Sequence, residues 1–118
     1  MNNLQKLYLD NNEIYNLSLF KDKNVSIHAN NQIISKAVTN TASLPSFRYE
    51  LNIEFLRDTN DTIPKINFIS NAGWEEVIAG EHYIVWTPTS KPMYLDFYFS
   101  SSSSLHTFNG SVHASVSD

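Results

Sequence analysis

Serine and histidine are the residue types in this chain that could carry nucleophilic catalysis, because it contains no cysteine. A catalytic serine usually sits on a sharp turn, as in Gly-x-Ser-x-Gly, with a histidine base and a carboxylate available to it. The sequence has many serines but no such setting. Its histidines stand singly in or beside predicted strands: His28, His82, His106 and His113. We interpret them as residues on the wet face or the rim of strands, and we expect no metal site.

Paired carboxylates are a second source of hydrolytic chemistry. Glu50 and Glu54 would share one face of one strand, but about 13 Å apart, which is too far for either kind of glycosidase pair. The three glycines are not clustered, so no glycine-rich phosphate loop exists. By elimination we expect a protein that is not an enzyme and that uses no cofactor.

The segment Asp58-Thr59-Asn60-Asp61 resembles the start of a calcium-binding loop. Ile63 and Ile69 stand at the sixth and twelfth positions, where an EF-hand loop needs glycine and glutamate. A hairpin turn is the favoured interpretation. A shallow calcium site built from loop carboxylates and carbonyls stays open as an alternative.

Aromatic residues on the wet side of strands are the remaining candidates for recognition. In residues 93–99 every second side chain would fill the core: Met93, Leu95, Phe97 and Phe99. The alternate side chains would project from the opposite face, about 7 Å apart: Tyr94, Asp96 and Tyr98. Flat rings flanking a carboxylate suit a sugar, whose C–H groups stack on aromatics while its hydroxyls bond to polar side chains.

Three further residues complete the predicted glycan-facing or partner-facing set: Arg48, Asn52 and Trp86. Arg48 and Asn52 belong to a second polar row that could share the sheet with the tyrosines. Trp86 lies between Val85 and Thr87, a position that favours core or rim packing. The whole set also fits a plain outer surface or a contact with a neighbouring subunit, since exposed tyrosines pair well across strands.

A period of two is the strongest pattern in the sequence. From Phe47 apolar side chains alternate with Arg48, Glu50, Asn52 and Glu54, which predicts a ten-residue strand, FRYELNIEFL, with one dry face and one wet face. The same alternation recurs in five shorter runs: 25–29, 66–68, 83–87, 93–99 and 112–116. Within 66–68 it places Ile66 and Phe68 on one face.

Turn-forming residues separate these runs, at 21–24, 30–31, 58–61, 71–73, 88–92 and 109–110. Only residues 1–20 and 32–38 could also be interpreted as helical. The sequence therefore predicts an all-β fold of eight or nine short strands, in a single antiparallel two-sheet β-sandwich with a jelly-roll-like topology. This domain would span residues 1–118, with 1–20 as an N-terminal arm or edge strand.

Length and composition limit the classes of protein to which this chain can belong. A chain of 118 residues is the size of one domain. It has 8 basic and 12 acidic residues, which argues against binding nucleic acid. No run of about 18 apolar residues predicts insertion into a membrane. Residues 1–6 lack the basic and then apolar pattern of a secretory signal.

Four segments within residues 47–117 carry a resemblance to a known family: FRYELNIEFL, IPKINFISNAGWEEVIAGEHYIVWTPTS, MYLDFYFS and FNGSVHASVS. They resemble the non-catalytic jelly-roll modules of the carbohydrate-binding type, which are appended to glycosidases and also occur in bacteriophage tail and fibre proteins. The resemblance implies either a glycan-binding module or a structural part of a virus particle.

The function that we expect first is a structural or binding module of a bacteriophage virion, as a tail, fibre, baseplate or capsid-decoration component. Its partners would be other virion subunits or further copies of itself in a homo-oligomer, and its location the virion. The alternative is a carbohydrate-binding or lectin-like domain, secreted or on a cell surface, that recognises a cell-surface glycan on one sheet face.

Overall fold

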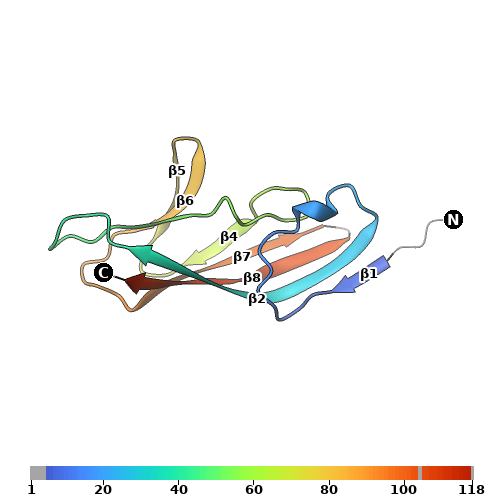
Figure 1. Cartoon of the computed structure of the whole chain (residues 1–118), viewed down its shortest axis with the longest axis horizontal. Helices are drawn as coiled ribbons and strands as arrows, with labels where there is room; N and C mark the ends of the chain where they lie inside the picture. The colour runs from blue at the N-terminus through green and yellow to red at the C-terminus, as the bar shows by residue number, and fades with distance from the viewer. Residues whose placement is uncertain (1–4, 104, 118) are drawn as a thin grey trace.

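The computed structural model describes residues 5–103 and 105–117, which form eight β-strands and one short 3₁₀ helix (Figure 1). The strands are β1 (Gln5–Tyr8), β2 (Val25–Thr39), β3 (Tyr49–Asn52), β4 (Lys65–Ile69), β5 (Trp74–Ile78), β6 (Glu81–Trp86), β7 (Tyr94–Ser102) and β8 (His106–Ser117). Helix η1 (Ser18–Phe20) lies between β1 and β2. Residues 32–38 belong to β2, so their helical alternative is wrong.

The strands form a five-stranded sheet in the order β1-β2-β8-β7-β4 and a three-stranded sheet in the order β3-β6-β5. The prediction of an all-β, two-sheet, sandwich-like fold is confirmed, and β1 is an edge strand. The prediction of a purely antiparallel fold is wrong, because β1 pairs in parallel with β2, and β2 in parallel with β8. Alternation reports which face of a strand is buried; it carries no information on strand direction.

One hydrophobic core lies between the two sheets. The five-stranded sheet contributes Leu95, Phe97 and Phe99 of β7, and the three-stranded sheet contributes side chains such as Tyr49 and Ile84. Burying a side chain of this size stabilises the fold by about 1.5 to 3 kcal/mol. The core therefore depends on the alternation that the sequence shows in β7.

Two details of the predicted alternation differ from the structure. Met93 is 84% exposed, because β7 begins at Tyr94 and Met93 lies before the strand. In residues 47–55 the buried positions Tyr49, Leu51 and Ile53 are as expected, but the strand itself covers only Tyr49–Asn52. From Glu54 the chain turns into the connection that leads to the other sheet.

A β-bulge interrupts β2. Its register against β8 shifts between Ala29 and Gln32, and Asn31 has a φ of 59°. The extra residue reverses the facing of the strand, so that Ile27 and Ala29 are buried before it and Gln32 and Ile34 after it.

Both Asn30-Asn31 and Asn109-Gly110 were expected to be turns, and both lie inside strands. They meet at the bulge: the Asn31 backbone N–H donates to Asn109 Oδ1 at 2.8 Å, and Asn109 Nδ2 donates to Asn30 Oδ1 at 2.8 Å. A β-carbon on Gly110 would lie 2.1 Å from the carbonyl oxygen of Gln32. Asparagine tolerates positive φ and glycine allows close approach, so one composition serves a bulge as well as a turn.

A second bulge lies in edge strand β4, whose register against β7 shifts between Ile66 and Phe68. Phe68 is 55% exposed, so the prediction that it shares the buried face of Ile66 is wrong. The bulge turns the Phe68 ring outward, beside Tyr98.

Candidate functional site

The outer face of the five-stranded sheet, the side turned away from the core, carries exposed rings. As the sequence predicted, Tyr94 and Tyr98 project from this face, with exposed fractions of 58% and 47%. Ile33 of β2 and Phe68 of β4 are also exposed. Large apolar side chains that gather on one face in this way are typical of a contact surface.

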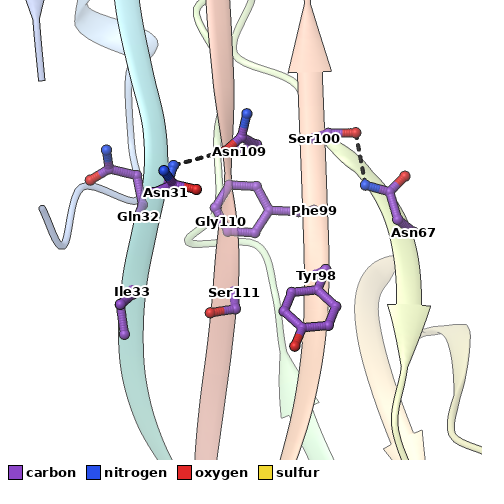
Figure 2. Close-up of a pocket in the computed structure, with 10 residues that line it drawn as sticks. All are labelled: Asn31, Gln32, Ile33, Asn67, Tyr98, Phe99, Ser100, Asn109, Gly110 and Ser111. Carbon is purple, nitrogen blue, oxygen red and sulfur yellow. Dashed lines mark hydrogen bonds between the residues drawn. The ribbon is translucent and has the colours of Figure 1, made fainter. Parts of the chain in front are cut away.

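A hollow of about 430 Å³ lies on the outer face where the bulge of β2 meets β8, β7 and β4. Figure 2 shows the residues that line it: Asn31, Gln32, Ile33, Asn67, Tyr98, Phe99, Ser100, Asn109, Gly110 and Ser111. We call it the Tyr98 hollow. None of the described residues that line it carries a charge. The side-chain amides of Asn31, Asn67 and Asn109 and the hydroxyls of Ser100 and Ser111 give it both donors and acceptors.

The Tyr98 ring is held in place by its neighbour. The centroids of the Phe68 and Tyr98 rings are 5.9 Å apart, with the ring planes tilted by 33°. Next to Phe68 on β4, Asn67 Nδ2 donates to Ser100 Oγ of β7 at 2.8 Å (Figure 2). The ring and the amide therefore stand on adjacent strands of a paired ladder, which fixes their spacing.

Asp96 lies between the two tyrosines, as predicted, but its carboxylate is engaged. His113 of β8 is its direct partner in the ladder, and His113 Nδ1 lies 2.5 Å from Asp96 Oδ1. The other ring nitrogen, Nε2, lies 3.3 Å from the hydroxyl of Ser111. The predicted role of Asp96 as a carboxylate open to sugar hydroxyls is therefore not what the geometry offers.

Sequence analysis missed the Ser111–His113–Asp96 cluster because it considered each histidine alone. A signal was present: Ser111 and His113 are two residues apart on one strand, and the antiparallel pairing of β7 with β8 brings His113 opposite Asp96.

A second hollow, of about 400 Å³, lies farther along the outer face. It is lined by Ser35, Lys36, Tyr94, His113 and Ser115. His113 thus borders one hollow while Ser111 borders the other, and the Asp96–His113 pair lies between the two tyrosines.

Arg48 and Asn52 do not join this face, because Asn52 lies on β3 of the three-stranded sheet and Arg48 directly precedes that strand. Arg48 Nε donates to Glu50 Oε2 at 2.6 Å, and this hydrogen bond raises the pKa of the guanidinium. Asn52 Nδ2 donates to Glu81 Oε2 at 3.0 Å. The prediction that this polar row could share a sheet with the tyrosines is wrong, since β3 pairs with β6.

Trp86 does not contribute a ligand-facing ring. Its side chain is fully buried in the core between the sheets. The prediction that Trp86 lies on the binding surface is therefore wrong, and the interpretation of Trp86 as a core residue is confirmed.

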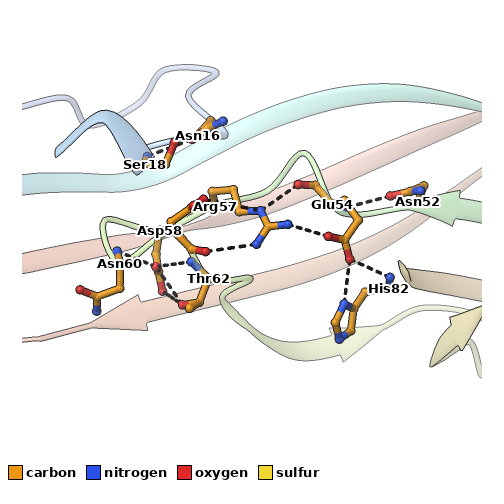
Figure 3. Close-up of polar contacts among 10 residues, drawn as sticks. Asn16, Ser18, Asn52, Glu54, Arg57, Asp58, Asn60, Thr62 and His82 are labelled. Atoms are coloured by element: carbon orange, nitrogen blue, oxygen red, sulfur yellow. Dashed lines mark hydrogen bonds and ion pairs between the residues drawn. The ribbon is translucent and has the colours of Figure 1, made fainter. Parts of the chain in front are cut away.

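Two polar clusters hold the connection between β3 and β4 (Figure 3). Glu54 accepts hydrogen bonds from the backbone N–H of His82 and from His82 Nδ1, each at 2.8 Å, and pairs with Arg57. The pKa of the Glu54 carboxyl is lowered, first by the His82 backbone hydrogen bond and then by the His82 side chain. These bonds favour the charged carboxylate.

The segment Asp58 to Asp61 forms a tight turn, but in this inter-sheet connection rather than in a hairpin. The Asp58 carboxylate accepts hydrogen bonds from the N–H groups of Asn60 and Thr62 and from the hydroxyls of Thr62 and Ser101. Its oxygens are thus used to stabilise the turn. Among residues 5–103 and 105–117 no three His, Asp or Glu side chains are grouped as a metal site requires.

Comparison with known proteins found no family model and no curated protein that matches this chain. No helix in the described part of the chain is long and apolar enough to cross a membrane.

Proposed function

We propose that this chain is a binding module that holds a saccharide in the Tyr98 hollow on the outer face of its five-stranded sheet. The observation that carries the proposal is the combination of an exposed, supported ring with the amides of Asn31, Asn67 and Asn109 in one uncharged hollow. The C–H face of a sugar ring stacks on an aromatic ring, and its hydroxyls pair with groups that both donate and accept. A protein with this role would be secreted or exposed on a surface.

The absence of charge in the lining favours a neutral sugar over an anionic one. An anionic ligand would need a cation to offset its desolvation, and none of the described side chains in this hollow supplies one. Asp96 and His113, an ionisable pair on the same face, already bond to each other. We therefore expect neutral hexoses and their oligomers to bind better than uronic or sialic acids.

A glycan array followed by calorimetric titration tests this proposal. Tyr98→Ala removes the stacked ring and should cost about 1 to 3 kcal/mol of binding free energy, by analogy with base stacking. Tyr8→Ala is the control, since Tyr8 is an exposed tyrosine on β1 that lies outside the hollow. Equal affinity of the Tyr98→Ala variant and the wild type would contradict the proposal, and so would an array on which no glycan binds.

A second candidate function is a structural part of a virus particle, as a tail, fibre, baseplate or capsid-decoration component. It is supported by the two edges of the five-stranded sheet, β1 and β4, and by the exposed Phe68 on β4. Unpaired edges recruit further strands, and repeated subunits associate through such contacts. A jelly-roll-like topology, which the resemblance implies, belongs to this proposal as well.

Sedimentation at tens of micromolar protein tests the structural role. Self-association that Phe68→Ser weakens would support it. A strict monomer over that range would contradict the homo-oligomer and leave the saccharide proposal as it stands, because the latter needs no second copy.

A further inference from the structure

Ser111, His113 and Asp96 stand in a row across β8 and β7 in the order of a nucleophile, a base and a carboxylate. Ser111 Oγ lies 3.3 Å from His113 Nε2, and His113 Nδ1 lies 2.5 Å from Asp96 Oδ1. A hydrogen bond from nucleophile to base, and another from base to an orienting group, are the geometric criteria for an activated serine. We infer that these residues form a serine-based relay that hydrolyses small, neutral carboxylic esters.

The hydrogen-bond chemistry decides which nitrogen of the imidazole faces Asp96 with a proton. An ionised carboxylate only accepts hydrogen bonds, so the short contact to Asp96 requires a proton on His113 Nδ1. In the neutral imidazole, Nε2 then keeps its lone pair and accepts the hydroxyl proton of Ser111. This is the tautomer that a general base requires, and the carboxylate would stabilise the imidazolium that forms.

The positions of the three side chains are fixed by the sheet. Asp96 is the direct ladder partner of His113, and Tyr98 is the direct ladder partner of Ser111. Ser70 secures the backbone of Asp96 on both sides: its N–H donates to the Asp96 carbonyl and its hydroxyl accepts from the Asp96 N–H, each at 2.9 Å. Side chains on paired strands need little reorganisation before they react.

Substrate would reach the relay through the Tyr98 hollow. Ser111 lines this hollow, and the Tyr98 ring stands across the ladder from it on the same outer face (Figure 2). We assign to the Tyr98 hydroxyl the role of donor to the negative charge that develops on the carbonyl oxygen. The uncharged lining suits an ester without a carboxylate of its own.

The reaction balances without any cofactor. Ser111 Oγ forms a bond to the acyl carbon as its proton passes to His113 Nε2; the bond from that carbon to the alcohol oxygen breaks, and the proton leaves with the alcohol. Water then adds to the acyl-serine, gives a proton to Nε2, and releases the carboxylic acid as the proton returns to Ser111 Oγ.

Two measurements on the whole chain test the relay. The first follows hydrolysis of p-nitrophenyl acetate, a neutral ester without sugar, and the second locates a fluorophosphonate adduct by mass spectrometry. Ser111→Ala should reduce the rate at least about a hundredfold, toward that of buffer, and abolish the adduct. Ser115→Ala is the matched control: Ser115 also lies two residues from His113, but its hydroxyl donates to the Lys36 carbonyl. That variant should keep both the rate and the adduct.

Tyr98→Phe separates this activity from saccharide binding. It keeps the ring that a sugar would stack on and removes the hydroxyl, so hydrolysis should fall about tenfold or more while saccharide affinity changes little. A wild-type rate equal to that of buffer, a rate unchanged in Ser111→Ala, or an adduct elsewhere than Ser111 would overturn the relay. None of these results bears on saccharide binding, which the glycan array measures separately. A positive result would contradict our expectation, from the sequence, that the protein is not an enzyme.

Discussion

The outer surfaces of the two sheets differ in the kinds of side chain that they expose to water. On the three-stranded sheet and the connection that follows β3, charges pair with their own neighbours: Arg48 with Glu50 and Glu76, and Glu54 with Arg57 and His82. On the five-stranded sheet, exposed rings stand among uncharged amides and hydroxyls.

This difference identifies the face on which a ligand would gain most. A paired surface charge gains little binding free energy from a new partner, since it must give up both its water and its present neighbour. An exposed ring still holds apolar area that would yield about 25 cal/mol per Å² when covered. The face with rings is therefore the stronger candidate for binding.

The largest effect should come from comparing two adjacent residues of β7 that face opposite ways. Phe97→Ala removes a fully buried ring and should lower the free energy of unfolding by about 3 to 5 kcal/mol. Tyr98→Ala should cost less than about 1 kcal/mol, because that ring is half exposed. Urea denaturation followed by circular dichroism measures both. Similar losses in the two variants would mean that the faces of β7 are wrongly assigned.

A smaller effect tests the bulge that shapes the Tyr98 hollow. Gly110→Ala would place its methyl group 2.1 Å from the backbone oxygen of Gln32. The strands must separate to admit it, at a cost of about 3 kcal/mol in unfolding free energy. Gly80→Ala meets no atom within 4 Å and has only a positive φ to overcome, at about 1 kcal/mol. Equal costs for the two variants, measured by urea denaturation, would argue that β8 does not lie against the bulge.

The faces of β7 and β3 could be predicted from the sequence because burial imposes a period of two on a regular strand. The bulges could not be predicted in this way, since each inserts a residue that breaks the period, and Phe68 was placed on the wrong face for this reason. The asparagine and glycine at the bulge of β2 were visible, but the conformations they favour are shared by turns.

The candidate site was predictable only in part. Tyr94, Asp96 and Tyr98 lie on one strand, so their common face follows from spacing alone. The contacts of Asp96 with His113, and of the hollow with Asn31 and Asn67, depend on which strands are neighbours. Arg48 and Asn52 were assigned to the same site because alternation does not reveal which of two sheets a strand joins.

Acidification should affect the charged side of the molecule first. The pKa of Glu54 is lower in the folded protein than its ordinary value of about 4.3, so its stabilising contribution is complete above that pH and is lost as the pH falls through the folded value. The urea midpoint should therefore drop below about pH 4 more steeply in the wild type than in Glu54→Gln, which has no carboxylate to protonate. The same pH dependence in both proteins would exclude Glu54 as a contributor.

The smallest effect is expected at Arg48, which tests whether the face with paired charges contributes to stability or to binding. The Arg48 side chain is 34% exposed in its pair with Glu50, so water and salt screen the attraction. Arg48→Ala should leave both the urea midpoint and the saccharide affinity unchanged within error. A loss of affinity in Arg48→Ala, with Tyr98→Ala unaffected, would move the binding site to the three-stranded sheet. The paired charges would then position one another for contact with the saccharide. The exposed rings of the five-stranded sheet would bind something other than this saccharide.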